Sequence, residues 1–74
     1  MRDLRIGILG FIKSGEEAGR FVEVIDDAGN SGGFLIVTYK DEARSPEIFD
    51  SWVESITDVD LFFDENGWEI EWLE

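Results

Sequence analysis

Two runs of β-favouring residues occupy the middle of the chain. Phe-Val-Glu-Val-Ile follows Arg20, and residues 34–39 read Phe-Leu-Ile-Val-Thr-Tyr. The segment between them, Asp27–Gly33, contains three glycines and Asn30, which are the residue types that adopt the positive φ angles of tight turns. The pattern predicts an antiparallel hairpin. Because residues 34–39 are almost continuously apolar, this strand is predicted to be central, with both of its faces partly covered.

The end of the chain alternates strictly between apolar and acidic residues. Trp-Glu-Ile-Glu-Trp occupies residues 68–72, and side chains of a strand point to opposite faces in turn. The pattern therefore predicts a strand with Trp68, Ile70 and Trp72 toward the core and Glu69 and Glu71 toward solvent.

Residues 3–13 have the apolar spacing of a helix. Asp3 is a candidate N-cap, and Gly15 would end the helix after about Lys13. Its apolar stripe consists of Leu4, Ile8, Phe11 and Ile12. Gly7 and Gly10 each cost about 1 kcal/mol relative to alanine inside a helix, so a strand is the alternative.

Residues 45–65 fit two descriptions. One is a single long helix, whose apolar face would hold Ile48, Trp52, Ile56, Val59 and Phe63. The other is a short strand over residues 48–53, followed by a helix that starts at Thr57 or Asp58. In both cases Asn66-Gly67 ends the helix.

Together these elements predict one α+β domain over residues 1–74. Its core would be a small, mainly antiparallel sheet of three or four strands with two helices packed on one face. The second helix would carry the chain back across the sheet by a right-handed crossover. On the other face, Glu69 and Glu71 are expected to join Glu23 or Asp26 in an acidic patch.

Charge adds a functional expectation to this fold. The 74 residues include 18 acidic and six basic ones, which gives a formal net charge of -12. Such a charge attracts basic partners and repels nucleic acids and anionic membranes, although acidity can also serve solubility alone.

The chain has no cysteine, which predicts a cytoplasmic location. Its longest apolar stretch, Leu4–Ile12, is about half the ~20 residues that cross a bilayer.

The residue types that most enzymes use are missing. The chain has neither histidine nor cysteine, so there is no thiol nucleophile, no Cys/His zinc site and no imidazole base. A glycine-rich phosphate loop is also unsupported, because Ile12 stands where a glycine is needed. The two acidic clusters with possible calcium-ligand spacing lack the turn glycine together with the closing glutamate. We therefore expect no catalytic residue, no cofactor and no metal.

Aromatic residues are expected mainly in the core of so small a domain. Phe62, Phe63, Trp68 and Trp72 are the ones for which this interpretation is strongest. Trp52 and Tyr39 are the candidates for a binding anchor, provided that they are exposed.

Several strings resemble a class of small acidic bacterial proteins. They are Gly33-Phe-Leu-Ile-Val-Thr, Phe49-Asp-Ser-Trp-Val-Glu54, Leu61-Phe-Phe63 and Trp68-Glu-Ile-Glu-Trp-Leu73. The resemblance, over the last two thirds of the chain, is to immunity proteins of contact-dependent or polymorphic toxin systems. It implies a cytosolic protein that binds and neutralises a toxin domain, and it transfers no site residues.

The sequence thus predicts a non-catalytic binding protein that inhibits a basic toxin or nucleic-acid-acting enzyme through its acidic surface. A nucleic-acid mimic from a phage or mobile element and a small accessory domain are the alternatives. The expected partner is a basic protein, with neither nucleic acid nor membrane as a target. The candidate contact residues are Glu23, Asp26, Asp50, Glu54, Glu69 and Glu71.

Overall fold

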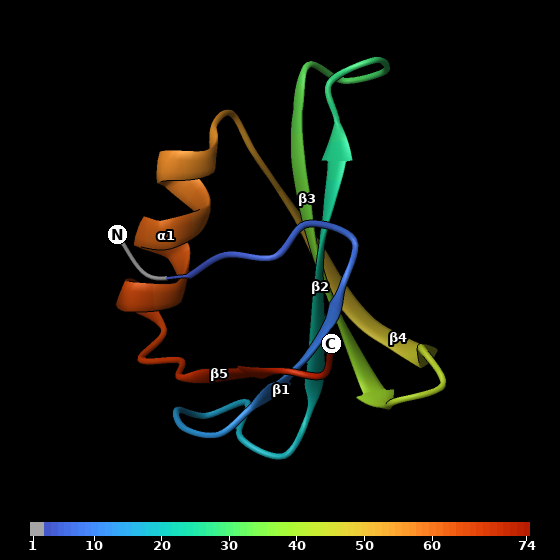
Figure 1. Cartoon of the computed structure of the whole chain (residues 1–74), viewed down its shortest axis with the longest axis vertical. Coiled ribbons are helices and arrows are strands. Elements are labelled where there is room, and N and C mark those ends of the chain that lie inside the picture. The colour runs from blue at the N-terminus through green and yellow to red at the C-terminus, as the bar shows by residue number, and fades with distance from the viewer. Residues whose placement is uncertain (1–2) are drawn as a thin grey trace.

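The computed structural model describes residues 3–74 as a five-stranded antiparallel sheet with one helix against one face (Figure 1). The elements are β1 (Leu9–Ile12), β2 (Phe21–Asp27), β3 (Gly33–Asp41), β4 (Ser45–Val53), α1 (Ile56–Glu65) and β5 (Ile70–Trp72). The strand order is β4-β3-β2-β1-β5. The predicted fold class, with two helices on three or four strands, is therefore wrong. The described chain is mainly β, with a single short helix.

The predicted hairpin is confirmed as β2 and β3. Their register pairs Val24 with Ile36 and Glu23 with Val37. Since side chains alternate across a strand, Val24 and Ile36 point toward α1, while Val37 points to the opposite face. Both Ile36 and Val37 are buried, as expected for a strand that is covered on its two faces.

The first segment is a strand where the apolar spacing predicted a helix. β1 pairs with β2 on one side and with β5 on the other. A Cβ on Gly10 would lie 2.5 Å from Ile70 Cγ2 and 2.9 Å from Trp72 Cε3. Gly10 thus lets the side chains of β5 pack directly on the backbone of β1. Gly7 adopts a φ of 75°, a conformation that interrupts a right-handed helix.

Of the two descriptions of residues 45–65, the strand followed by a helix is correct. β4 is longer than predicted, and α1 begins at Ile56, earlier than the expected Thr57 or Asp58. The N-cap is Ser55, whose Oγ accepts a hydrogen bond from the Asp58 backbone N–H at 3.3 Å. Serine is among the residues that most favour this position. The predicted end of the helix is confirmed, because Asn66 is the C-cap.

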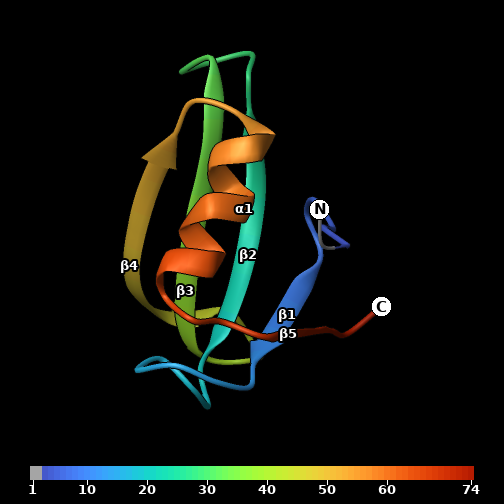
Figure 2. The same ribbon diagram turned by 90° about the vertical axis from the view of Figure 1, so that its left-hand side faces the viewer.

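Helix α1 carries the chain from one edge of the sheet to the other, from β4 to β5 (Figure 2). Within residues 3–74, no helix is long and apolar enough to cross a membrane.

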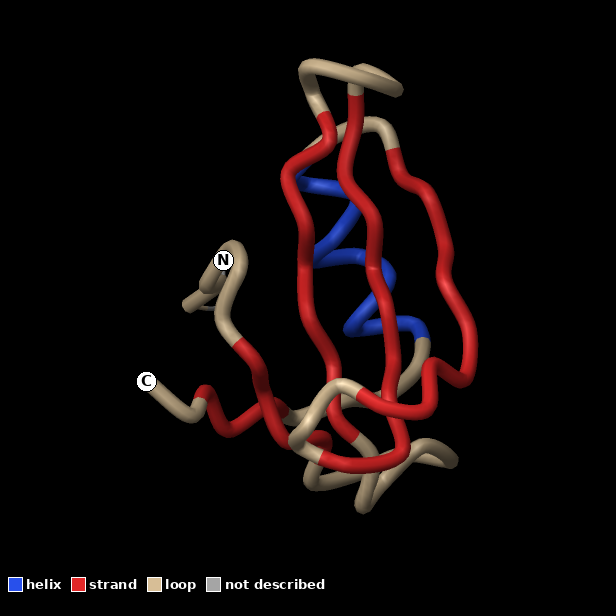
Figure 3. The backbone as a smooth tube through the Cα atoms, turned by 90° about the vertical axis from the view of Figure 1, so that its right-hand side faces the viewer, coloured by secondary structure: helices blue, strands red, loops and turns tan. Residues whose placement is uncertain are grey.

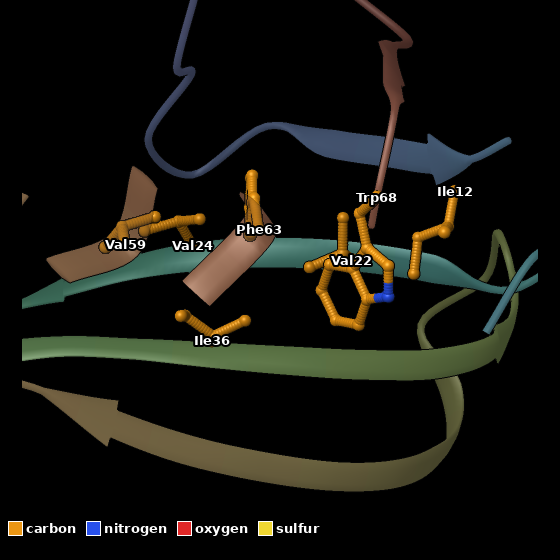
Figure 4. Packing of buried hydrophobic residues seen from close by; sticks show 7 residues of the cluster. All are labelled: Ile12, Val22, Val24, Ile36, Val59, Phe63 and Trp68. Carbon is orange, nitrogen blue, oxygen red and sulfur yellow. The ribbon is translucent and has the colours of Figure 1, made fainter. Parts of the chain in front are cut away.

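The main core lies between α1 and the sheet (Figure 4). Phe63 is fully buried, and its ring centroid lies 5.5 Å from that of Trp68 and 6.5 Å from that of Trp72. The inward orientation predicted for Trp68 is confirmed, and Glu69 and Glu71 are exposed as expected. A smaller cluster on the opposite face is centred on Leu9, Val37 and Tyr39.

Candidate binding surface

The negative charge is concentrated in one part of the chain. Residues 45–74 contain ten aspartates and glutamates and no lysine or arginine, so they carry -10 of the formal -12. These residues form β4, α1, β5 and their connections. The negative potential is therefore centred on the helix and on the two edges of the sheet, away from the central strands.

A groove lies within this acidic part, between the end of β4 and α1. It has a volume of about 370 Å³. Its lining consists of Trp52, Val53, Glu54, Asp58, Leu61, Phe62 and Glu65. Trp52 and Leu61 are each 48% exposed, although large apolar side chains are usually buried. Three carboxylates beside apolar side chains form a site suited to a lysine or arginine, whose long stem is apolar and whose end is cationic.

Trp52 is exposed and yet held in place. Its indole Nε1 donates a hydrogen bond to Ser31 Oγ at 2.8 Å. The ring lies over Gly33, because a Cβ there would come within 2.6 Å of the same Nε1. An ordered, exposed aromatic side chain fits the role of a binding anchor. Tyr39, the other candidate, is only 8% exposed, so it is not an exposed anchor.

Glu23 is already engaged within the chain. Its side chain is 14% exposed, and its Oε1 accepts hydrogen bonds from Tyr39 Oη at 3.1 Å and from Arg44 Nε at 3.0 Å. Burial is the larger cause, and the hydrogen bond to Glu23 the next, of a rise in the pKa of Tyr39 to about 12. Both causes disfavour the charged phenolate. These contacts make Glu23 a structural part of the smaller cluster, in which one carboxylate serves two donors.

This arrangement predicts a loss of stability at high pH. The pKa of Tyr39 is about 12 in the folded chain, against an ordinary value of 10.0, so the folded state favours the protonated hydroxyl. The resulting stabilisation is complete below pH 10.0 and is lost as the pH rises to about 12. It amounts to about 1 to 2 kcal/mol, because solvent near the hydroxyl screens part of the interaction.

Urea unfolding at a series of alkaline pH values measures this loss. Tyr39→Phe should flatten the pH dependence, since phenylalanine has no hydroxyl to ionise. An equally steep decline in the variant would contradict the assignment to Tyr39.

The other predicted contact residues lie in different places. Asp26 is exposed in the β2–β3 hairpin, and its Oδ1 accepts a hydrogen bond from the Ala28 backbone N–H at 2.9 Å. Asp50 is exposed on β4 opposite Val37, and Glu54 lines the groove.

The predicted acidic patch of Glu69 and Glu71 with Glu23 or Asp26 does not form as expected. Phe11 pairs with both Glu71 and Phe21, so Glu71 lies level with residue 21 of β2. Asp26 is further along β2 by a distance of roughly 17 Å. Glu23 is nearer, but it is bonded to Tyr39 and Arg44.

The contribution of α1 to the groove was not predicted from the sequence. Asp58, Leu61 and Glu65 come from the helix, and only Glu54 was among the predicted contacts. The sequence does contain one indication that the helix belongs to the acidic surface, because no lysine or arginine follows Arg44.

A larger hollow of about 860 Å³ lies beside β5, between Trp72, Lys13 and Ser14. Several of its polar groups bond to one another. Ser14 Oγ accepts from the Glu69 backbone N–H at 2.9 Å and donates to the Gly67 carbonyl at 2.7 Å. Trp72 Nε1 donates to the carbonyl of Asp3 at 2.9 Å. These bonds join the two ends of the chain, and the side chains of Lys13, Asp64 and Glu69 also line the hollow.

Among the described residues, no group of three or more histidine, cysteine, aspartate or glutamate side chains is placed to hold a metal ion. Comparison of the chain with protein-family models, with curated proteins and with solved structures finds no match.

Proposed function

We propose that this chain is a non-catalytic binding protein that inhibits a basic partner, as an immunity protein inhibits a toxin domain. One observation carries the proposal: residues 45–74 have ten carboxylates and no cation, and they expose Trp52 and Leu61 beside those carboxylates. Acidity that serves solubility alone does not require exposed large apolar residues. Their combination with a charged border is typical of a surface that meets another protein.

The charge favours a basic partner over a second copy of the chain, because each copy carries a formal charge of -12. A field of this sign accelerates encounter with a cationic surface and opposes the approach of a like-charged one. Enzymes that act on nucleic acids are basic where they bind phosphate, so an acidic protein can occlude that surface. The absence of cysteine agrees with a reducing cytoplasm as the place of action.

The nucleic-acid mimic receives no comparable support. A mimic requires carboxylates in one stripe at phosphate-like spacing. Here they are distributed over several elements: α1 contains Asp58 and Asp60, β5 contains Glu71, and the turn after β3 contains Glu42.

Affinity capture followed by an activity assay tests the proposal. The immobilised chain is exposed to extract of its source cells at 0.1 M and 1 M salt, where the Debye length is about 10 Å and about 3 Å respectively. We expect a basic enzyme to be retained at low salt and released at high salt. Its turnover should then fall when the purified chain is added at equal concentration. Retention of no basic protein, or undiminished turnover of the retained enzyme, would refute the proposal.

A further inference from the structure

The sheet has one long free edge. β4 lies at one end of the strand order and has nine residues, and within the part of the chain that the structure describes it pairs with β3 alone (Figure 3). β5 at the opposite edge has three residues. An edge strand presents backbone N–H and C=O groups that can pair with another extended segment. Pro46 lacks an N–H, which limits such pairing to the residues that follow it.

The side chains along β4 determine which segment fits. Glu47, Asp50 and Glu54 are exposed on or just after the strand, and neither β4 nor α1 contains a lysine or arginine. Pairing of β4 with β4 of a second copy would bring these carboxylates close to each other, and like charges on paired strands are destabilising. A basic segment would instead bring cations toward Glu54, which lines the groove. Glu47 and Asp50 pair with Tyr39 and Val37, so they lie on the face opposite α1.

We infer that β4 accepts an extended basic segment of the partner protein as a sixth strand, and that the groove beside α1 binds its lysine or arginine side chains. The inference rests on the proposed function and specifies how the partner is recognised. Backbone hydrogen bonds to β4 supply affinity that is independent of sequence. The groove supplies selectivity, because it receives only alternate side chains of an added strand.

The lining of the groove can contact both the apolar stem and the charged end of a lysine or arginine side chain. The apolar stem would pack against Leu61 and Phe62, and the charged end would reach the carboxylates of the groove, as the two-part character of lysine and arginine requires. Side chains of the added strand that point to the other face would meet Ile48 and Trp52, which are 37% and 48% exposed, with the exposed Asp50 between them. The preferred segment therefore has basic residues on the helix side and, level with Ile48 and Trp52, apolar residues on the other side.

The probe for this inference is a short synthetic peptide of alternating arginine and valine. Two control peptides have the same length: one carries N-methyl groups on alternate backbone nitrogens, and the other has glutamate in place of arginine. Titration is followed by the fluorescence of the chain and by amide hydrogen exchange. We expect the arginine peptide to bind and to slow exchange in β4 more than in β2. N-methylation should weaken binding by more than about tenfold, because several backbone hydrogen bonds are lost.

Matched protein variants separate the groove from general charge. Glu54→Gln with Glu65→Gln removes two carboxylates of the groove, whereas Glu42→Gln with Glu71→Gln removes two exposed carboxylates elsewhere, in the turn after β3 and on β5 at the opposite edge of the sheet. We expect the first pair to weaken peptide binding about fivefold and the second pair to change it less than about twofold.

Three results would each overturn the inference. The N-methylated peptide could bind as tightly as the arginine peptide, the two variant pairs could weaken binding equally, or hydrogen exchange in β4 could remain unchanged. A dimer of the free chain that forms through β4, detected by sedimentation, would also overturn it. These failures are distinguishable from failure of the proposed function, because a basic enzyme could still be captured and inhibited through another surface.

Discussion

Replacement of Phe63 by alanine is expected to cost about 3 to 5 kcal/mol of folding free energy. Phe63 is fully buried on α1, and its ring contacts those of Trp68 and Trp72. The cavity would open where the helix, the last strand and the sheet meet. Folded domains have total stabilities of roughly 5 to 15 kcal/mol, and small ones fall in the lower part of that range. The variant should therefore be partly or wholly unfolded at physiological temperature.

Urea unfolding followed by tryptophan fluorescence measures this loss. Leu61→Ala is the matched control, because Leu61 lies on the same helix and is 48% exposed. Its cost should stay below about 1 kcal/mol. Similar losses in the two variants would mean that α1 does not pack against the sheet through Phe63.

The second large effect is expected for Gly33→Ala. A Cβ at Gly33 would collide with the carbonyl oxygen of Val53 and lie 2.7 Å from Trp52 Cε2. The first of these atoms belongs to the backbone of β4, so the strand itself must shift. A forced movement of this kind in a packed region typically costs about 1 to 3 kcal/mol. The fluorescence of Trp52 should change as well, because its indole lies over this glycine.

Gly29→Ala controls for the general effect of replacing a glycine. Gly29 lies in the loop that leads into β3, has a φ outside the left-handed region, and would place its Cβ in open space. We expect thermal unfolding of this variant to be unchanged or slightly improved, since alanine restricts the unfolded chain. A Gly33→Ala variant as stable as Gly29→Ala would contradict the close packing of Trp52 and Val53 on β3.

Local patterns predicted those elements whose cause is itself local. The β2–β3 hairpin was predictable because a glycine-rich turn separates two β-favouring runs, and its ends need no distant partner. The last strand followed from the strict alternation of residues 68–72, although only Ile70–Trp72 pair in the sheet.

The first segment was mispredicted because its conformation depends on residues at the other end of the chain. Leu4, Ile8, Phe11 and Ile12 satisfy a helical spacing, but Phe11 and Ile12 also occupy successive positions of a strand in the sheet. The deciding contact is between Gly10 and the side chains of β5, which come from the far end of the sequence. A short window around Gly10 contains no information on such a contact.

The candidate surface was only partly predictable for a similar reason. Asp50 and Glu54 were identified from charge, and they do lie on or beside the free edge of the sheet. The groove, however, depends on how α1 lies relative to β4, which brings Leu61 and Glu65 near Glu54. Glu23 illustrates the opposite case: charge made it a candidate contact, but its hydrogen bonds to Tyr39 and Arg44 give it an internal role.

The central claim is that the carboxylates beside β4 and α1 bind a basic partner. Its most direct test is the affinity of the captured partner for two variants of equal charge. Glu54→Gln with Glu65→Gln and Glu42→Gln with Glu71→Gln each remove two units from the formal -12. In dilute salt, we predict a weaker complex and a faster dissociation rate for the first variant, with the second close to the unaltered chain. Identical affinities of the two variants would contradict the claim.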